Sequence, residues 1–324
     1  MAGLLAFLER LADRVGVPYP VFFAVLCGSS YLVGVLLSWL MGSLDIFLAD
    51  HGFVLLCLFG FVCGFFALLL ARIFDDALEE AKSYAVLSEE EWRRFASKVR
   101  GLVGGWPCLA FFLFWVVYSF YCVFVSRDVW WSRGYSWQFA MDVYGFLVQA
   151  LNGCFLGGVF MGMVSVGFNL AFREISAKDV FKAEVASARG GLARFRGLVL
   201  AETFAAAVAS ALAISIWSGA AGYTPVIGSL AMVVPTAIYP HYVFHGVLSR
   251  AKERRIKLLE ERIDAVPSDE RTTLGDLITF NKLVMELEKA KNVKPWLVDL
   301  KAVLKLVGAT AASQVIALVI DYLV

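Results

Sequence analysis

Hydrophobic residues fill the chain in long blocks that short polar segments separate. A bilayer core about 30 Å thick needs about 20 apolar residues in each helix that crosses it. Six blocks meet this requirement, and a seventh, residues 303–324, closes the chain. The six are residues 20–42, 52–72, 103–125, 139–172, 197–218 and 224–248. The pattern predicts an all-α, polytopic membrane protein with about seven transmembrane helices.

The fourth block is too long for one simple crossing. From Phe139 to Phe172 its only charged residue is Asp142. A helix of that length extends for about 50 Å, well beyond the bilayer core. We therefore expect it to bend at its glycines or to continue as a packed helix outside the membrane.

The segments that flank the six blocks have helical patterns of their own. Leu4, Leu8 and Leu11 share one helical face, so residues 1–18 are expected to form an interfacial amphipathic helix before the six-helix transmembrane domain, residues 19–248. Residues 249–301 are rich in charge and carry a narrow apolar seam that predicts a cytosolic helical hairpin. Residues 302–324 would then form the seventh transmembrane helix.

Lysine and arginine are distributed unevenly among the connecting segments. Residues 72–100 contain six of them and residues 173–196 another six, whereas residues 43–52 contain none. Cytoplasmic loops of membrane proteins carry the excess of positive charge. The distribution therefore predicts a cytoplasmic N-terminus.

Composition supports the bilayer as the main partner of the chain. The chain of 324 residues is 60% hydrophobic and only 18% charged, and its formal net charge is +1. No basic, aromatic-rich face favours nucleic acid. The six cysteines lack CxxC spacing and are interpreted as packing residues, so no metal site or cofactor is expected. Sequence motifs of soluble enzymes are missing, and we expect no enzymatic activity.

A group of ionisable residues lies where the fifth and sixth blocks meet the cytoplasmic side. His241 and His245 share a helical face, but a metal would need more ligands. We interpret them as interfacial rings where the helix leaves the lipid and Pro240 bends it; pH sensing is the alternative. Glu202 is a functional candidate because burying a carboxylate is costly, although it also lies close enough to the preceding arginines to pair with them.

Acidic residues are concentrated near the expected outer ends of the helices. Asp45, Asp50 and Asp142 would form a negative outer vestibule in an oligomer, which would favour cations. The alternative is a scatter of ordinary interface charges.

The last block combines small, hydroxylated and aliphatic residues. In "GATAASQVIALVIDYLV", the side chains of Thr310, Ser313, Gln314 and Asp321 are candidates for the lining of a hydrated pore. The same small residues also allow close helix packing in lipid.

The arrangement of these blocks resembles the seven-transmembrane ion channels that include insect odorant and gustatory receptors. The long fourth block, the continuation after His245 and the hairpin before residue 301 carry the resemblance. In that family, helices four to six extend into the cytosol and join a central anchor, and the seventh helices of four subunits line the pore. The resemblance implies a homotetramer in the plasma membrane, and we expect the chain to be a remote, prokaryotic relative of that family.

Three functions are consistent with the sequence. The first is a homotetrameric, cation-permeable ion channel that a small hydrophobic ligand gates. The second is a non-conducting membrane scaffold or signalling protein that acts through the hairpin. The third is a secondary transporter, which would show broken helices in matched halves.

Overall fold

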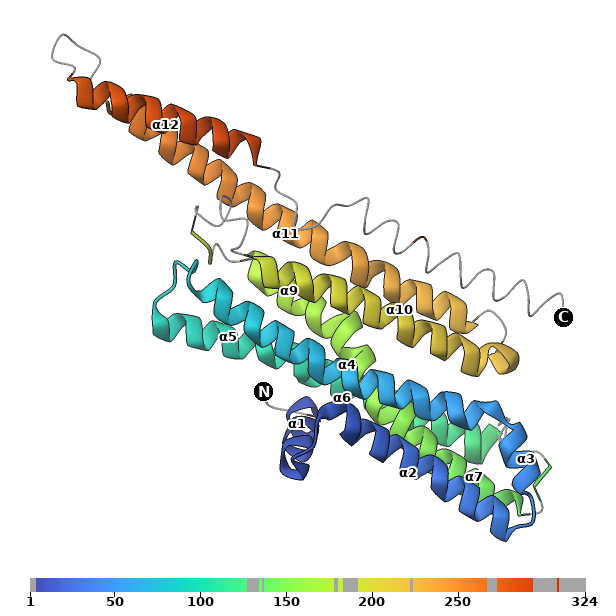
Figure 1. Ribbon diagram of the computed structural model, residues 1–324. Coiled ribbons are helices and arrows are strands. Elements are labelled where there is room, and N and C mark those ends of the chain that lie inside the picture. The colour runs from blue at the N-terminus through green and yellow to red at the C-terminus, as the bar shows by residue number, and fades with distance from the viewer. Residues whose placement is uncertain are drawn as a thin grey trace.

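A computed structural model of the protein describes residues 4–126, 134–135, 137–177, 180–182, 192–221, 224–266, 273–293 and 308. Every regular element in these residues is a helix (Figure 1). The β-type pairing among them is limited to one isolated antiparallel bridge between Ala85 and Phe181. The predicted all-α fold is therefore confirmed for the described residues.

The described helices are divided between the two halves of the chain. The first half contains α1 (Leu4–Val15), α2 (Tyr19–Leu40), α3 (Leu44–Ala49), α4 (His51–Lys82), α5 (Glu89–Gly104), α6 (Trp106–Phe120) and the π-helical η1 (Tyr121–Ser126). The second half contains α7 (Gln138–Val148), η2 (Gln149–Gly157), α8 (Gly158–Gly162), η3 (Met163–Gly167), α9 (Phe168–Ala177), α10 (Ala193–Ala221), α11 (Thr224–Asp264) and α12 (Leu274–Asn292).

Five helical stretches among the described residues are long and apolar enough to cross a membrane. They are Tyr19–Leu40, His51–Lys82, Glu89–Ser126, Gln138–Ala177 and Arg194–Ile216. These stretches overlap the first five predicted blocks and indicate a membrane-embedded protein. The sixth block forms the first part of α11, which is not one of the five, and the seventh lies outside the described residues apart from Gly308. Seven spans and the orientation of the chain stay predictions.

The overlong fourth block is one continuous helical path from α7 to α9, in which π-helical turns alternate with α-helical ones. Its glycines bring its backbone close to the preceding span. A Cβ atom on Gly162 would lie 2.6 Å from the carbonyl oxygen of Pro107, and one on Gly167 would lie 2.7 Å from that of Val103. The glycines therefore permit close helix packing, and α9 continues as a packed helix whose Phe168 is buried.

Helix α4 lies at the centre of the bundle, in contact with α2, η2 and α10. Its ring of Phe74 packs edge-on against Phe168 of α9 and Phe195 of α10, with centroid distances of 5.5 and 6.4 Å. Helix α10 in turn lies between α4 and α11 (Figure 1). Edge-to-face contacts between such aromatic rings contribute to the packing of the helices where they meet.

The two ends of the bundle differ in charge. We call the end that carries residues 72–104 and 193–196 the charged end, and the opposite end, with residues 40–52, the α3 end. At the charged end, α4 presents two pairs of carboxylates to two different helices. Arg100 of α5 binds Asp75 at 2.6 Å and Glu79 at 3.5 Å. Arg194 of α10 binds the second pair, Asp76 at 3.1 Å and Glu80 at 3.3 Å.

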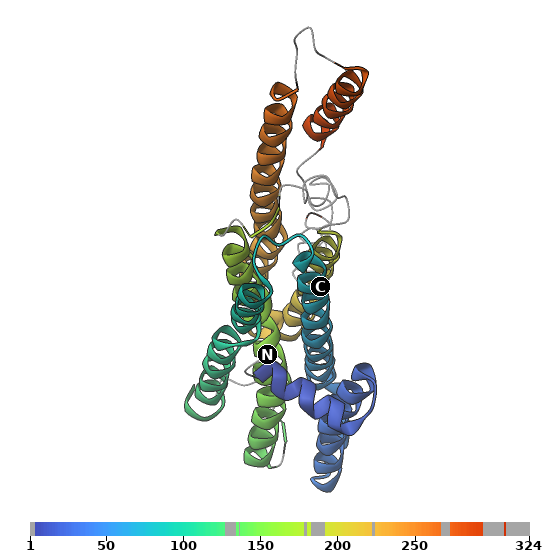
Figure 2. The same ribbon diagram turned by 90° about the vertical axis from the view of Figure 1, so that its left-hand side faces the viewer.

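Helix α11 continues past the charged end and pairs there with α12. Figure 2 shows the two helices projecting beyond the rest of the bundle. The Nζ atom of Lys252 donates hydrogen bonds to the carbonyl oxygens of Lys291 and Val293, at 2.6 and 2.9 Å. An ion pair of 3.2 Å joins Lys291 to Glu260. These contacts fix α12 antiparallel to α11.

We expect Arg100→Gln to lower the free energy of unfolding by about 1 kcal/mol, because Arg100 and Asp75 are both largely shielded from solvent. The matched control is Arg93→Gln, which removes an exposed pair with Glu89 at 3.9 Å and should change stability little. Thermal unfolding in detergent at low and high salt measures both variants. Equal effects of the two substitutions would contradict a special role for Arg100.

Candidate functional site

The side chain of Asn152, on the π-helical η2, is fully buried and lies beside Ser30 in the middle of α2. Its Nδ2 atom donates to the carbonyl oxygen of Val148 at 3.1 Å and to Oγ of Ser30 at 3.3 Å. Its Oδ1 atom has no hydrogen-bond partner within the described part of the chain. A buried amide oxygen of this kind can accept a hydrogen bond from a ligand or from water.

Ser30 joins three spans around this amide. Its Oγ donates to the carbonyl oxygen of Cys27 at 2.7 Å and lies 3.4 Å from Sγ of Cys57 on α4. Its own carbonyl oxygen accepts a hydrogen bond of 3.0 Å from the hydroxyl of Tyr144 on α7. We call Ser30, Cys57, Tyr144 and Asn152 the polar cluster.

Two glycines make room for the polar cluster. A Cβ atom on Gly60 of α4 would lie 2.3 Å from Oδ1 of Asn152, and one on Gly34 of α2 would lie 2.2 Å from the hydroxyl of Tyr144. Side chains at these positions would displace the amide or the phenol. The cluster is therefore built by small residues on α2 and α4 and large polar ones on the fourth span, where π-helical turns often mark functional positions.

Glu202 and His241 are the two ionisable candidates that the structure buries completely or nearly so, with exposed fractions of 0% and 1%. Neither their carboxylate oxygens nor their ring nitrogens have a hydrogen-bond partner within the described residues. Pro240 is buried beside His241, whereas His245 is half-buried. Among the described residues, Glu202 does not pair with the preceding arginines, and Arg194 instead binds Asp76 and Glu80 of α4.

The three aspartates suggested for a vestibule lie toward the α3 end of the bundle but differ in environment. Asp45 is exposed on α3, whereas Asp50 caps α4 by accepting a hydrogen bond of 2.9 Å from the backbone N–H of Gly52. Asp142 is half-buried, and its Oδ1 atom has no partner among the described residues. Burial raises the pKa of Tyr135 to about 12, and the charge of Asp50 adds to that shift.

The candidate pore residues Thr310, Ser313, Gln314 and Asp321 lie outside the described residues. Their role therefore stays a prediction. Within the described residues, no three His, Cys, Asp or Glu side chains are placed to hold a metal ion.

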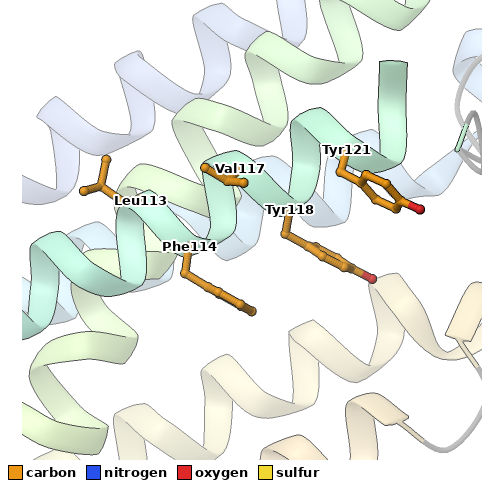
Figure 3. A pocket seen from close by; sticks show the side chains of 5 residues that line it. All are labelled: Leu113, Phe114, Val117, Tyr118 and Tyr121. Carbon is orange, nitrogen blue, oxygen red and sulfur yellow. The ribbon is translucent and has the colours of Figure 1, made fainter. Parts of the chain in front are cut away.

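An apolar groove of about 500 Å³ follows one face of the third span. It is lined by Leu113, Phe114, Val117, Tyr118 and Tyr121. Figure 3 shows Phe114 and Tyr118 projecting from the same side of α6. All five lining residues belong to α6 or the first turn of η1, so the groove is open and one-sided. Such a surface suits lipid chains or another apolar helix.

The chain shows no match to protein-family models, to characterised proteins or to solved structures. The site is therefore defined by its geometry alone. Asn152 and Tyr144 are not among the site residues expected from the sequence, although an asparagine inside a long apolar block is a recognisable signal. Chemically, the polar cluster can donate and accept hydrogen bonds, whereas Glu202 can hold a proton.

We expect Gly60→Ala to destabilise the protein, because its methyl group would enter the space of the Asn152 amide. Such overpacking costs about 1–3 kcal/mol. The control is Gly28→Ala on α2, where an added Cβ meets nothing within 4 Å. That change should leave stability equal or raise it, since alanine favours helix. Unfolding temperatures in detergent compare the two, and an unchanged Gly60→Ala protein would mean that the amide is free to move.

Proposed function

We propose that the protein is a homotetrameric, cation-permeable ion channel whose last helix lines the pore and which a small hydrophobic ligand gates. The observation that carries the proposal is the projecting pair of α11 and α12. One helix runs unbroken from the bundle into a segment that presents apolar side chains outside it. An assembly of several copies would cover those side chains.

The outward face of α12 supports self-association. Leu274, Ile278 and Met285 follow helical spacing and have exposed fractions of 75%, 62% and 58%. The opposite face packs on α11 through Ala290, which is buried. A contiguous apolar stripe on a segment rich in charge is typical of a protein–protein interface. The resemblance to seven-transmembrane channels makes a second copy of the chain the partner that we propose.

Cation selectivity is supported by the acidic residues toward the α3 end. Asp45 and Asp50 lie there on and beside α3, and Asp142 lies one turn into the fourth span. Repeated around a fourfold axis, these carboxylates would attract cations and repel anions.

A non-conducting scaffold is the second candidate, and the same exposed stripe favours it. On that reading α12 binds a different protein, and no shared central path forms. Absence of currents together with a monomeric state would favour this function.

The assembly prediction concerns the protein in nanodiscs. Particle imaging along the membrane normal should show a fourfold ring with one helix of each subunit at the axis. Ile278→Asn should shift the particles toward monomers because it places an amide in the apolar stripe. Thr279→Asn changes the neighbouring exposed residue and should leave the rings intact. Monomers in the unaltered protein would contradict the channel.

The pore prediction concerns Gln314. If the last helix lines the pore, Gln314→Leu should change conductance or selectivity, because it removes the amide from the hydrated path, without preventing assembly. Currents across planar bilayers measure this effect, and imaging confirms that the variant still assembles. Unchanged currents would remove this residue from the pore.

A further inference from the structure

Glu202 belongs to α10, the helix that packs between α4 and α11 (Figure 1). Its side chain is fully buried, and neither carboxylate oxygen has a hydrogen-bond partner among the described residues. An ionised carboxylate without a partner is strongly disfavoured in such a place, whereas the neutral acid is tolerated. The environment on each neighbouring helix therefore decides which form Glu202 adopts.

The neighbouring part of α4 is apolar. The rings of Phe66 on α4 and Phe204 on α10 are 6.1 Å apart. This contact shows which residues of the two antiparallel helices lie at the same height. Glu202 precedes Phe204 by two residues, so it lies level with about Leu68 on α4. Leu68 and the adjacent Ala67 are both buried. Neither offers a hydrogen bond or a counter-charge from its side chain.

The titratable groups of α4 on either side of this level do not supply a partner. Arg72 lies one turn toward the charged end, where it donates to the hydroxyl of Tyr19 and lies 3.8 Å from Asp13 and 4.0 Å from Glu9. Cys63 lies more than a turn toward the α3 end and is buried. The four carboxylates beyond Arg72 are bound to Arg100 and Arg194 at the charged end.

Helix α11 places a histidine one turn away. The rings of Phe195 and Phe244 are 5.0 Å apart. The two helices are antiparallel, so seven residues after Phe195 on α10 correspond to seven residues before Phe244 on α11. Glu202 therefore lies level with about residue 237 of α11. His241 is therefore about one turn closer to the charged end, and neither of its ring nitrogens bonds to Glu202.

The remaining titratable groups near this layer are directed elsewhere or lie farther away. Tyr239 and His245 on α11 are half-buried. On α10 itself, Arg194 binds Asp76 at 3.1 Å, and Arg196 is exposed. No described base therefore compensates a negative charge on Glu202.

We propose that Glu202 is a proton-binding site, protonated in this packing, and that loss of its proton loosens α10 from α4 and α11. The ligand is the proton itself. The packed state holds a proton that a solvated glutamate releases at neutral pH, so packing weakens as the pH rises. The inference concerns the helix layer and holds for a channel and for a scaffold alike.

Infrared difference spectroscopy in nanodiscs tests the protonation directly. At neutral pH, the spectrum of the unaltered protein minus that of Glu202→Gln should contain the carbonyl stretching band of a protonated carboxylic acid, and this band should be lost as the pH is raised. The same subtraction with Glu288→Gln, an exposed glutamate on α12, should not contain the band. Its absence from the Glu202→Gln difference at neutral pH would overturn the proposal.

Two further measurements keep the test decisive. If Glu202→Gln fails to fold, carbon-13-labelled glutamate in the unaltered protein identifies a protonated glutamate by the isotope shift of the same band. The absence of a shifted band would refute the site.

Thermal unfolding tests the coupling to packing. The unaltered protein should lose stability between neutral and alkaline pH, and Glu202→Gln should lose less. Parallel pH profiles would refute the coupling.

Discussion

An apolar surrounding forces every backbone polar group to find its partner inside its own segment, and the rest of this structure depends on that constraint. It makes the spans helical. It also makes polar side chains between the spans conspicuous, because each one must bond to a neighbour or remain neutral. The Nδ2 atom of Asn152 meets the demand through Ser30 and the backbone of its own helix, and the amide is neutral although its Oδ1 atom has no partner among the described residues. Glu202 has no such neighbour among the described residues, and this difference separates a structural polar cluster from an ionisable site.

Two kinds of interaction hold the helices, and they occupy different parts of the bundle. Between the spans, aromatic rings such as Phe74 fill the space and glycines bring backbones together. At the charged end, the carboxylates of α4 are shared between α5 and α10 through Arg100 and Arg194. These ion pairs therefore attach α4 to α5 on one side and to α10 on the other, on the charged-end side of the layer that contains Glu202. A loosening of that layer would leave the ends of α4 and α10 attached.

The sequence predicts the helices well because long apolar blocks and charged connections are properties of the chain itself. It predicts the site less well. The periodicity of α10 does not show which face meets α4, so the burial of Glu202 follows only from the packing of Phe195 and Phe204 on their partners. Tyr144 reaches Ser30 across 114 positions of sequence, and nothing local indicates that contact. For Thr310, Ser313, Gln314 and Asp321, the sequence remains the only guide.

The unbroken course of α11 has a mechanical consequence. Pro235 and Pro240 both lie inside this helix, and each removes a backbone hydrogen bond and eases bending at its position. From Pro240 to the end of the helix at Asp264 the rod is about 36 Å long. A tilt of about 10° at the proline moves the far end by about 6 Å, roughly one helical turn. If the contacts of Phe244, Arg250 and Arg254 with Phe172, Ser176 and Phe181 were released, the helix would act as a lever arm in which a small rearrangement among the spans displaces α12 by a larger distance.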